Sequence, residues 1–192
     1  IWDYDDLKEM CDMDAVEAFR ARALNPEHPV MRGSHQNGDI FFQNREASNA
    51  YYEAVPGIVE EYMDKVNAKL GTDYKLFNYY GAKDAETVII AMGSVCETIE
   101  ETVDHLNAAG EKVGLVKVHL YRPFSVKHLI ASLPKTVKSI SVLDRTKEPG
   151  SIGEPLYLDV VAALRNTAFE NVPVYTGRYG LGSKDTTPAQ IA

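Results

Sequence analysis

Two short loops carry residue types that suit the binding of an anion. Each loop follows a predicted strand, at 86–92 and 137–143, and leads into a helical pattern. Glycine lets the backbone turn tightly at such a place, and the free N–H groups of a helix start attract negative charge. An arginine and a lysine in the second loop add positive charge. The candidate residues are Gly93, Ser94, Arg145, Lys147, Gly150 and Gly153.

Each loop also has a structural interpretation. Ser94 and Glu97 form the S-x-x-E pattern of a capping box, which satisfies N–H groups at a helix start. In the second loop Asp144, Glu148 and Glu154 offset the basic residues. A loop with a net negative charge is a poor phosphate cradle, so packing against another domain is the favoured interpretation. The G-x-G-x-x-G and G-x-x-x-x-G-K-[ST] motifs of dinucleotide and NTP sites do not occur.

Nucleophiles and metal ligands are sparse. Cys11 and Cys96 are the only cysteines, and they form no CxxC pair that would build a zinc or iron–sulfur site. The helix dipole is expected to lower the thiol pKa of Cys96. A base is missing, however, because His105 lies about two and a half turns further along the same helix, so a structural role is favoured. No two histidines have the i, i+4 spacing of a metal helix, and we predict neither a catalytic residue nor a metal site.

Composition narrows the choice of partner and compartment. The net charge of −8 argues against nucleic acid and anionic membranes, which both attract basic proteins. The low cysteine count is typical of a reducing cytoplasm. No apolar run reaches the ~18 residues of a membrane span, and the first residues lack the pattern of a signal peptide.

The second part of the chain alternates strand and helix patterns. This order predicts an α/β fold with a mostly parallel sheet of about four to five strands and helices on both faces. The predicted strands are 86–92, 113–121, 137–143 and 172–176, and the predicted helices cover 95–106, 126–133 and 157–164.

The first part is a helical and loop segment. A helical pattern occupies 1–24, and a polar loop follows with a possible short strand at Ile40–Gln43. An amphipathic helix then ends at Gly71, and we expect its regular part to begin near Pro56. We therefore divide the chain into residues 1–72, 73–178 and 179–192.

The last residues have the pattern of a helix start. Thr187 is a good N-cap residue and Pro188 suits the first helical position. The helix that they announce is missing from the sequence, so we expect the chain to be part of a longer protein.

Six blocks of sequence resemble pyruvate:ferredoxin (flavodoxin) oxidoreductase, of the 2-oxoacid oxidoreductase family. One departure from the family pattern is the run GSHQNG at 33–38, where the family has a GT-A-Q-N-P-like run. The blocks, in chain order, are FRARALNPEHPVMRG, QNGDIFFQNREASNAYYEAVPGIVEEYM, VIIAMGSVCETIEET, VGLVKVHLYRPFS, SVLDRTKEPGSIGEPLYLDVVAAL and GRYGLGSKDTTPAQI.

The resemblance implies a place within a large enzyme. Residues 1–72 would be the C-terminal part of its pyrimidine-binding thiamine domain with a connecting helix. Residues 73–178 would be a second domain like the transketolase C-terminal domain, and 179–192 a linker into the next domain. The implied parent, expected to be a homodimer, converts pyruvate and coenzyme A to acetyl-CoA and CO₂ and reduces ferredoxin or flavodoxin. Its thiamine diphosphate, Mg²⁺ and [4Fe-4S] clusters are bound elsewhere, so no catalytic or cofactor residue carries over to this chain.

Three functions remain open at this point. The favoured one is a non-catalytic scaffold segment of the parent enzyme, in which the loop from Asp144 to Glu154 sets the register between domains. The second is a free-standing α/β module that binds a nucleotide or coenzyme A at the strand carboxyl ends. The third, a docking domain for ferredoxin, is disfavoured because both proteins would be acidic.

Overall fold

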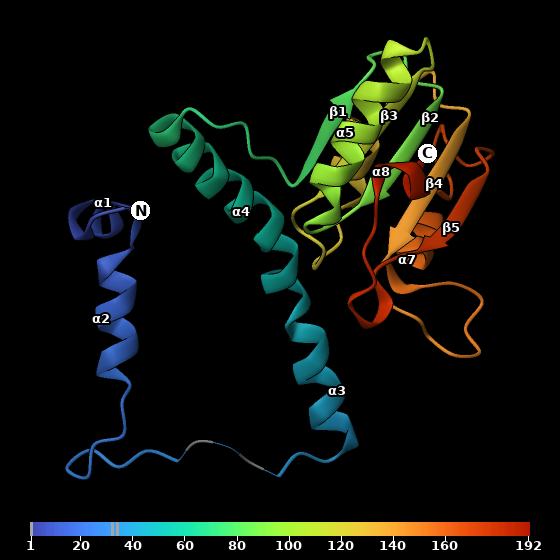
Figure 1. The fold of residues 1–192 in the computed structure, drawn as a ribbon. Coiled ribbons are helices and arrows are strands. Elements are labelled where there is room, and N and C mark those ends of the chain that lie inside the picture. Colours follow the sequence, from blue (N-terminus) through green and yellow to red (C-terminus); the bar gives the residue numbers. More distant parts are fainter. Residues whose placement is uncertain (1, 32, 34) are drawn as a thin grey trace. The chain divides into compact units, whose positions relative to one another are not determined.

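The computed structural model describes residues 2–31, 33 and 35–192. The chain divides into two compact units, Ile1–Tyr51 and Tyr52–Ala192, and Figure 1 shows the ribbon of both. No helix in the described part of the chain has both the length and the apolar character needed to cross a membrane.

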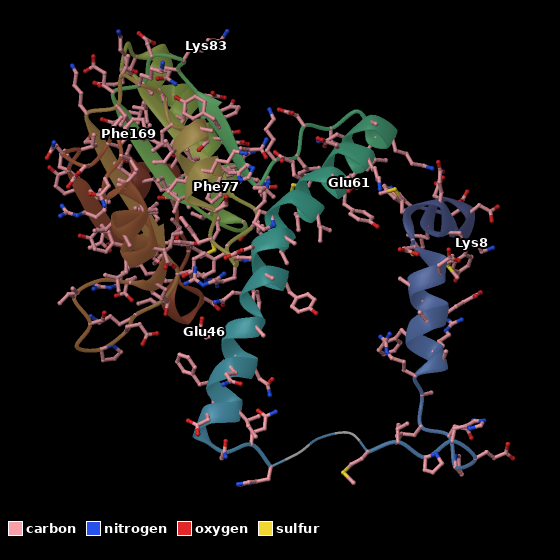
Figure 2. All side chains as sticks on the ribbon, turned by 180° about the vertical axis from the view of Figure 1, so that it is seen from behind. Lys8, Glu46, Glu61, Phe77, Lys83 and Phe169 are labelled. Carbon is pink, nitrogen blue, oxygen red and sulfur yellow. The ribbon has the colours of Figure 1, made fainter. Side chains whose placement is uncertain are left out.

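The first unit consists of short helices started by side-chain caps. Helices α1 (Tyr4–Met10), α2 (Met13–Ala21) and α3 (Gly38–Ala47) begin after Asp3, Asp12 and Asn37. The predicted strand at Ile40–Gln43 is wrong, because these residues lie in α3. The Asn37 side chain accepts the N–H of Ile40 at 3.1 Å, and this cap outweighs the β-propensity of the Ile-Phe-Phe run. No residue of the three helices is buried. Figure 2 shows the side chains of the described residues as sticks.

Helix α4 (Asn49–Leu70) continues unbroken through Pro56. The expectation that the regular helix begins near Pro56 is wrong: a proline removes one backbone N–H donor, and the flanking turns continue the helix across it. Gly71 ends the helix with a φ of 69°, as predicted. Val59 and Met63 of α4 pack against the core of the second unit.

The second unit contains a five-stranded sheet in the order β1-β3-β2-β4-β5. Only β1 runs antiparallel to its neighbour, and the remaining strand pairs are parallel. The mostly parallel α/β fold is therefore confirmed, and four of the strands match the predicted ones. Strand β1 was not predicted. The strands are β1 (Phe77–Gly81), β2 (Thr87–Ala91), β3 (Val113–Val118), β4 (Ser139–Asp144) and β5 (Val174–Arg178).

Helices cover both faces of this sheet (Figure 1). Alternate strand residues point to opposite faces, so Ile90 and Val116 belong to one core cluster and Ile89 and Leu115 to the other. Helices α6 and α7 pack on the first cluster, whereas α5 packs on the second. The helices are α5 (Val95–Ala108), α6 (Val126–Ser132) and α7 (Pro155–Leu164).

The chain ends in a single helical turn, α8 (Pro188–Ile191). Thr187 and Gln190 form its capping box, so the helix start predicted from Thr187 is confirmed. The expectation that the helix itself is missing was wrong for this first turn. Ile191 packs against the cluster beneath α5, which ties the end of the chain to the sheet.

Candidate functional site

The carboxyl ends of the four parallel strands lie at one edge of the sheet. Open α/β sheets bind their ligands at this edge. Both candidate loops lie here, one after β2 and the other after β4, and a third loop follows β5. The side chains on this edge therefore decide between an anion site and a packing turn.

Asp144, the last residue of β4, occupies the start of helix α7. Its side chain is buried, and its carboxylate accepts the N–H of Leu156 at 3.0 Å and that of Tyr157 at 3.1 Å. Burial raises the pKa of Asp144, while the two N–H bonds act in the opposite direction. The helix start that the sequence offers as an anion site thus already holds a carboxylate of the chain itself.

Glu154 closes the same loop from its other end. The residue is only 1% exposed, and its carboxylate accepts the N–H of Glu148 at 2.8 Å and pairs with the guanidinium of Arg178 on β5. This pairing holds the pKa of Glu154 below its ordinary value. Both buried acids of the loop therefore serve its internal structure.

The two glycines of the loop also serve the turn. Gly150 has a φ of 82°, which only glycine adopts readily. A Cβ on Gly153 would lie 2.3 Å from Cδ1 of Tyr157, so the first turn of α7 leaves no space for a side chain there. Lys147 is exposed at the surface of the loop. The geometry supports the interpretation of this loop as a packing turn.

The side chain of Arg145 reaches the loop after β5. Its Nε donates to the carbonyl of Gly180 at 3.2 Å, in the loop after β5. The hydroxyl of Tyr179 donates to the carbonyl of Met92 at 3.3 Å, at the end of β2. These two bonds join the loops after β2, β4 and β5 around a common cavity.

The cavity has a volume of about 230 Å³ and a polar lining. Ser94 and Arg145, both predicted candidates, line it, whereas Gly93 precedes it and Lys147, Gly150 and Gly153 lie outside its lining. Sequence reasoning missed the contribution of the loop after β5. The run Gly180-Leu-Gly-Ser-Lys184 was the available signal, because a lysine beside two glycines at a strand end suits an anion. The polar lining residues are Ser94, Thr98, Arg145, Ser183, Lys184, Asp185 and Thr186.

The predicted capping box at Ser94 does not form. Ser94 makes no side-chain cap bond, because its φ of −64° and ψ of −20° are helical. A capping residue needs extended backbone geometry for its oxygen to reach the N–H groups of the first turn. The hydroxyl of Ser94 is thus left facing the cavity.

Cys96 in the first turn of α5 is buried, and burial raises its pKa to about 11. The expected lowering of this pKa by the helix dipole is therefore wrong, since loss of water around the thiolate outweighs the dipole. The geometry favours the structural role of Cys96. In the described part of the chain, no three His, Cys, Asp or Glu side chains are placed to hold a metal ion.

Another basic residue of this edge, Arg122, is already neutralised. Arg122, in the loop after β3, pairs with Asp159 of α7 at 2.6 Å and stacks on the ring of Tyr121. The Tyr121 hydroxyl also donates to Asp159, and burial together with this bond raises its pKa to about 12. This cluster fastens the β3 loop to α7.

Comparison with known proteins shows which family the chain resembles. The family description "Pyruvate flavodoxin/ferredoxin oxidoreductase, thiamine diP-bdg" matches residues 1–64, and "Pyruvate:ferredoxin oxidoreductase core domain II" matches residues 85–191. The chain is similar over its whole length to a pyruvate-flavodoxin oxidoreductase of Enterobacter agglomerans, with 60% identity, and covers 16% of that protein. It is 57% identical to a pyruvate:ferredoxin oxidoreductase of Moorella thermoacetica, with 98% of the chain and 16% of the relative aligned.

A solved structure is similar only at a low level. The 2-oxoglutarate:ferredoxin oxidoreductase of Magnetococcus marinus aligns with 70% of this chain and 21% of its own, with 24% identity and a TM-score of 0.42. The chain spans about one sixth of the length of the curated relatives. The two family matches, in chain order, and the high identities agree with the resemblance found in the sequence, and the chain belongs to the pyruvate:ferredoxin (flavodoxin) oxidoreductase family.

Proposed function

We propose that the chain is a non-catalytic scaffold segment of a pyruvate:ferredoxin (flavodoxin) oxidoreductase. The parent enzyme oxidatively decarboxylates pyruvate with coenzyme A, giving acetyl-CoA and CO₂, and passes electrons to ferredoxin or flavodoxin. The observation that carries the proposal is the in-order match of two family descriptions to a chain that spans 16% of its relatives. The buried acids of the loop after β4 add support, because they are engaged in internal bonds.

The residues of this chain do not fit the parent's iron–sulfur clusters or its Mg²⁺ ion. A [4Fe-4S] cluster needs four cysteines, and the sequence has two. The described residues hold no cluster of three acidic, histidine or cysteine side chains for the Mg²⁺ that accompanies thiamine diphosphate. We therefore propose that other parts of the parent hold the clusters and Mg²⁺. The resemblance found in the sequence implies the same for thiamine diphosphate.

The proposed domain organisation follows from this placement. Residues 1–72 form the C-terminal part of the thiamine domain with its connecting helix, 73–178 the second domain, and 179–192 the linker to the next one. No residue of α1, α2 or α3 is buried, which supports the first assignment, because such helices need further partners to bury their apolar side chains. We also propose a homodimeric parent in the cytoplasm, a location in keeping with two free cysteines.

The loop after β4 sets the register of the second domain against its neighbours in this proposal. Its buried contacts give it one defined shape: Asp144 holds the start of α7, and Glu154 holds Arg178 on β5. A rigid surface loop presents a fixed contour to another domain.

The test is to read the coding sequence on both sides of the chain and to produce the full product. We expect that product to reduce a viologen dye with pyruvate and coenzyme A, while the 192-residue chain alone does not. Dye reduction by the pure chain, or a reading frame that ends close to residues 1 and 192, would overturn the proposal.

A second function is favoured by one observation. The cavity between the loops after β2, β4 and β5 is lined by Arg145 and Lys184. It lies where an α/β module binds its ligand, so binding of a nucleotide or coenzyme A at the strand carboxyl ends is the alternative. Retention of such a ligand by the chain on its own separates the alternative from the scaffold role.

A further inference from the structure

We propose that the carboxyl-edge cavity, lined by Ser94, Arg145 and Lys184, binds a phosphate group. The inference goes beyond the scaffold role, because it needs only the Tyr52–Ala192 unit and no activity of a parent enzyme. Its basis is a set of side chains brought together from three separate loops.

Two positive charges face this cavity without a negative partner among the described residues. Arg145 comes from the loop after β4 and Lys184 from the loop after β5. Neither forms an ion pair with any described residue, whereas Arg122 and Arg178 at the same edge are held by carboxylates. One carboxylate, that of Asp185, also lines the cavity, so the lining keeps a net positive charge in a chain whose total is −8. An anion is therefore the ligand that fits.

Hydroxyl groups complete the lining. The side chains of Ser94, Ser183 and Thr186 make no hydrogen bond with another described residue and are free to donate. A phosphate group has several acceptor oxygens, so it satisfies two cations and several hydroxyls at once, and bonds of this charge-assisted kind are strong. A carboxylate has only two oxygens and uses fewer of these donors.

The cavity is held in shape before any ligand arrives. The bond from Arg145 to Gly180 and that from Tyr179 to Met92 fix the three loops against one another. A preformed site loses less conformational entropy on binding. The first turn of α5 lies beside the cavity and adds its dipole, but the proposal rests on the unpaired cations and hydroxyls.

The size of the cavity limits the ligand. Its volume of about 230 Å³ is below the roughly 300–1,000 Å³ of pockets that enclose drug-sized ligands. It accommodates a phosphate or diphosphate group, and any organic part of the ligand would extend into solvent or toward another domain. The proposed class is thus a phosphate or the phosphate end of a larger molecule.

The experiment is a ¹H–¹⁵N NMR titration of the 192-residue chain with inorganic phosphate and with pyrophosphate. We expect shifts of the backbone amides of Ser94 and of residues 180–186, with an affinity that falls as ionic strength rises. Arg145→Gln and Lys184→Gln should each weaken binding by about tenfold. Lys147→Gln is the matched control, because Lys147 lies in the same loop as Arg145 but outside the cavity lining. It should bind like the unaltered chain.

Several results would overturn the proposal. These are the absence of saturable shifts, shifts centred on other residues, equal binding by acetate, or unchanged binding in the variant with both Arg145 and Lys184 replaced. The unaltered amide spectrum outside the cavity shows that each variant is folded. Failure here leaves the scaffold proposal untouched, since that one is decided by the pyruvate-dependent activity of the full product.

Discussion

Among single residues, Glu154 shows how pairing with a cation creates a pH-dependent contribution to stability. Arg178 holds its pKa below the ordinary value. A carboxyl group whose folded-state pKa is depressed stabilises the fold above its unfolded pKa, about 4.3 for Glu. That stabilisation is lost as the pH falls through the folded-state value. The ion pair therefore acts at neutral pH and fails in acid.

We accordingly expect Glu154→Gln to lower the Tm at pH 7, because the neutral Gln side chain forms no ion pair with Arg178. The difference from the unaltered chain should shrink as the pH is lowered below about 4. Glu148→Gln is the matched control, since Glu148 lies in the same loop and contributes only its backbone N–H to the contact. Thermal unfolding followed between pH 3 and pH 7 measures both variants, and a Tm difference that is independent of pH would contradict the assignment.

Cys96 gives a second prediction at the residue scale. With a pKa raised to about 11 by burial, only about one Cys96 in a thousand is a thiolate at pH 8, and the thiolate is the reactive form. We expect a thiol reagent to modify the exposed Cys11 quickly in the native chain and Cys96 only after unfolding. In Cys11→Ser, the native protein should be nearly unreactive. Rapid reaction of this variant would show that Cys96 is accessible.

At the scale of elements, the sequence predicts those strands and helices whose formation depends mainly on the residues within them. The strand at 86–92 is an apolar run buried on both faces of the sheet, which its composition alone predicts. The strand at 137–143 alternates apolar and polar residues, and the period of two predicts it. Strand β1 was not predicted from the sequence, because Phe77–Gly81 is an edge strand with mixed polarity. It forms by pairing with β3, some 40 residues away. Helix α3 was mistaken for a strand because one cap at Asn37 decided between two local propensities.

The candidate site was predicted only in part, because local sequence patterns place some of its residues and tertiary pairing places the others. Ser94 and Arg145 follow strands that the sequence marks clearly, so their place at the carboxyl edge could be foreseen. Lys184 was missed, because only tertiary pairing of β5 with β4 brings its loop beside Arg145. The role of Asp144 was not predicted either. Its carboxylate caps a helix that begins about 12 residues later in the chain, and no short sequence motif indicates such a contact.

The prediction for helix α7 concerns this cap. Asp144→Ala removes the acceptor of two backbone N–H groups, at Leu156 and Tyr157, and leaves them unsatisfied. We expect a loss of about 1–2 kcal/mol in the free energy of unfolding. Asp144→Asn keeps one acceptor oxygen, so its loss should be smaller. Urea unfolding followed by tyrosine fluorescence compares the two variants, and equal stability of Asp144→Ala and the unaltered chain would refute the capping role.

At the scale of the whole molecule, the two units differ in how much apolar surface they bury. The second unit has a core on each face of its sheet. In the first unit, no residue of α1, α2 or α3 is buried, and Phe19, Phe41 and Phe42 are all exposed. Short helices without tertiary packing are marginal in water. The two units should therefore open with very different free energies.

Limited proteolysis tests this difference. In the 192-residue chain, trypsin should first cut within residues 1–51, at sites such as Lys8, Arg20 and Arg45, and leave a resistant product that contains the sheet. Cleavage that follows local opening depends on the population of the open form, which is high where no core must be broken. In the full product of the gene the same sites should be protected, because the proposed thiamine domain would cover them. Protection of residues 1–51 in the chain alone would contradict the inference that these helices need a partner, and cleavage of both units at one rate would contradict the separate stability of the sheet.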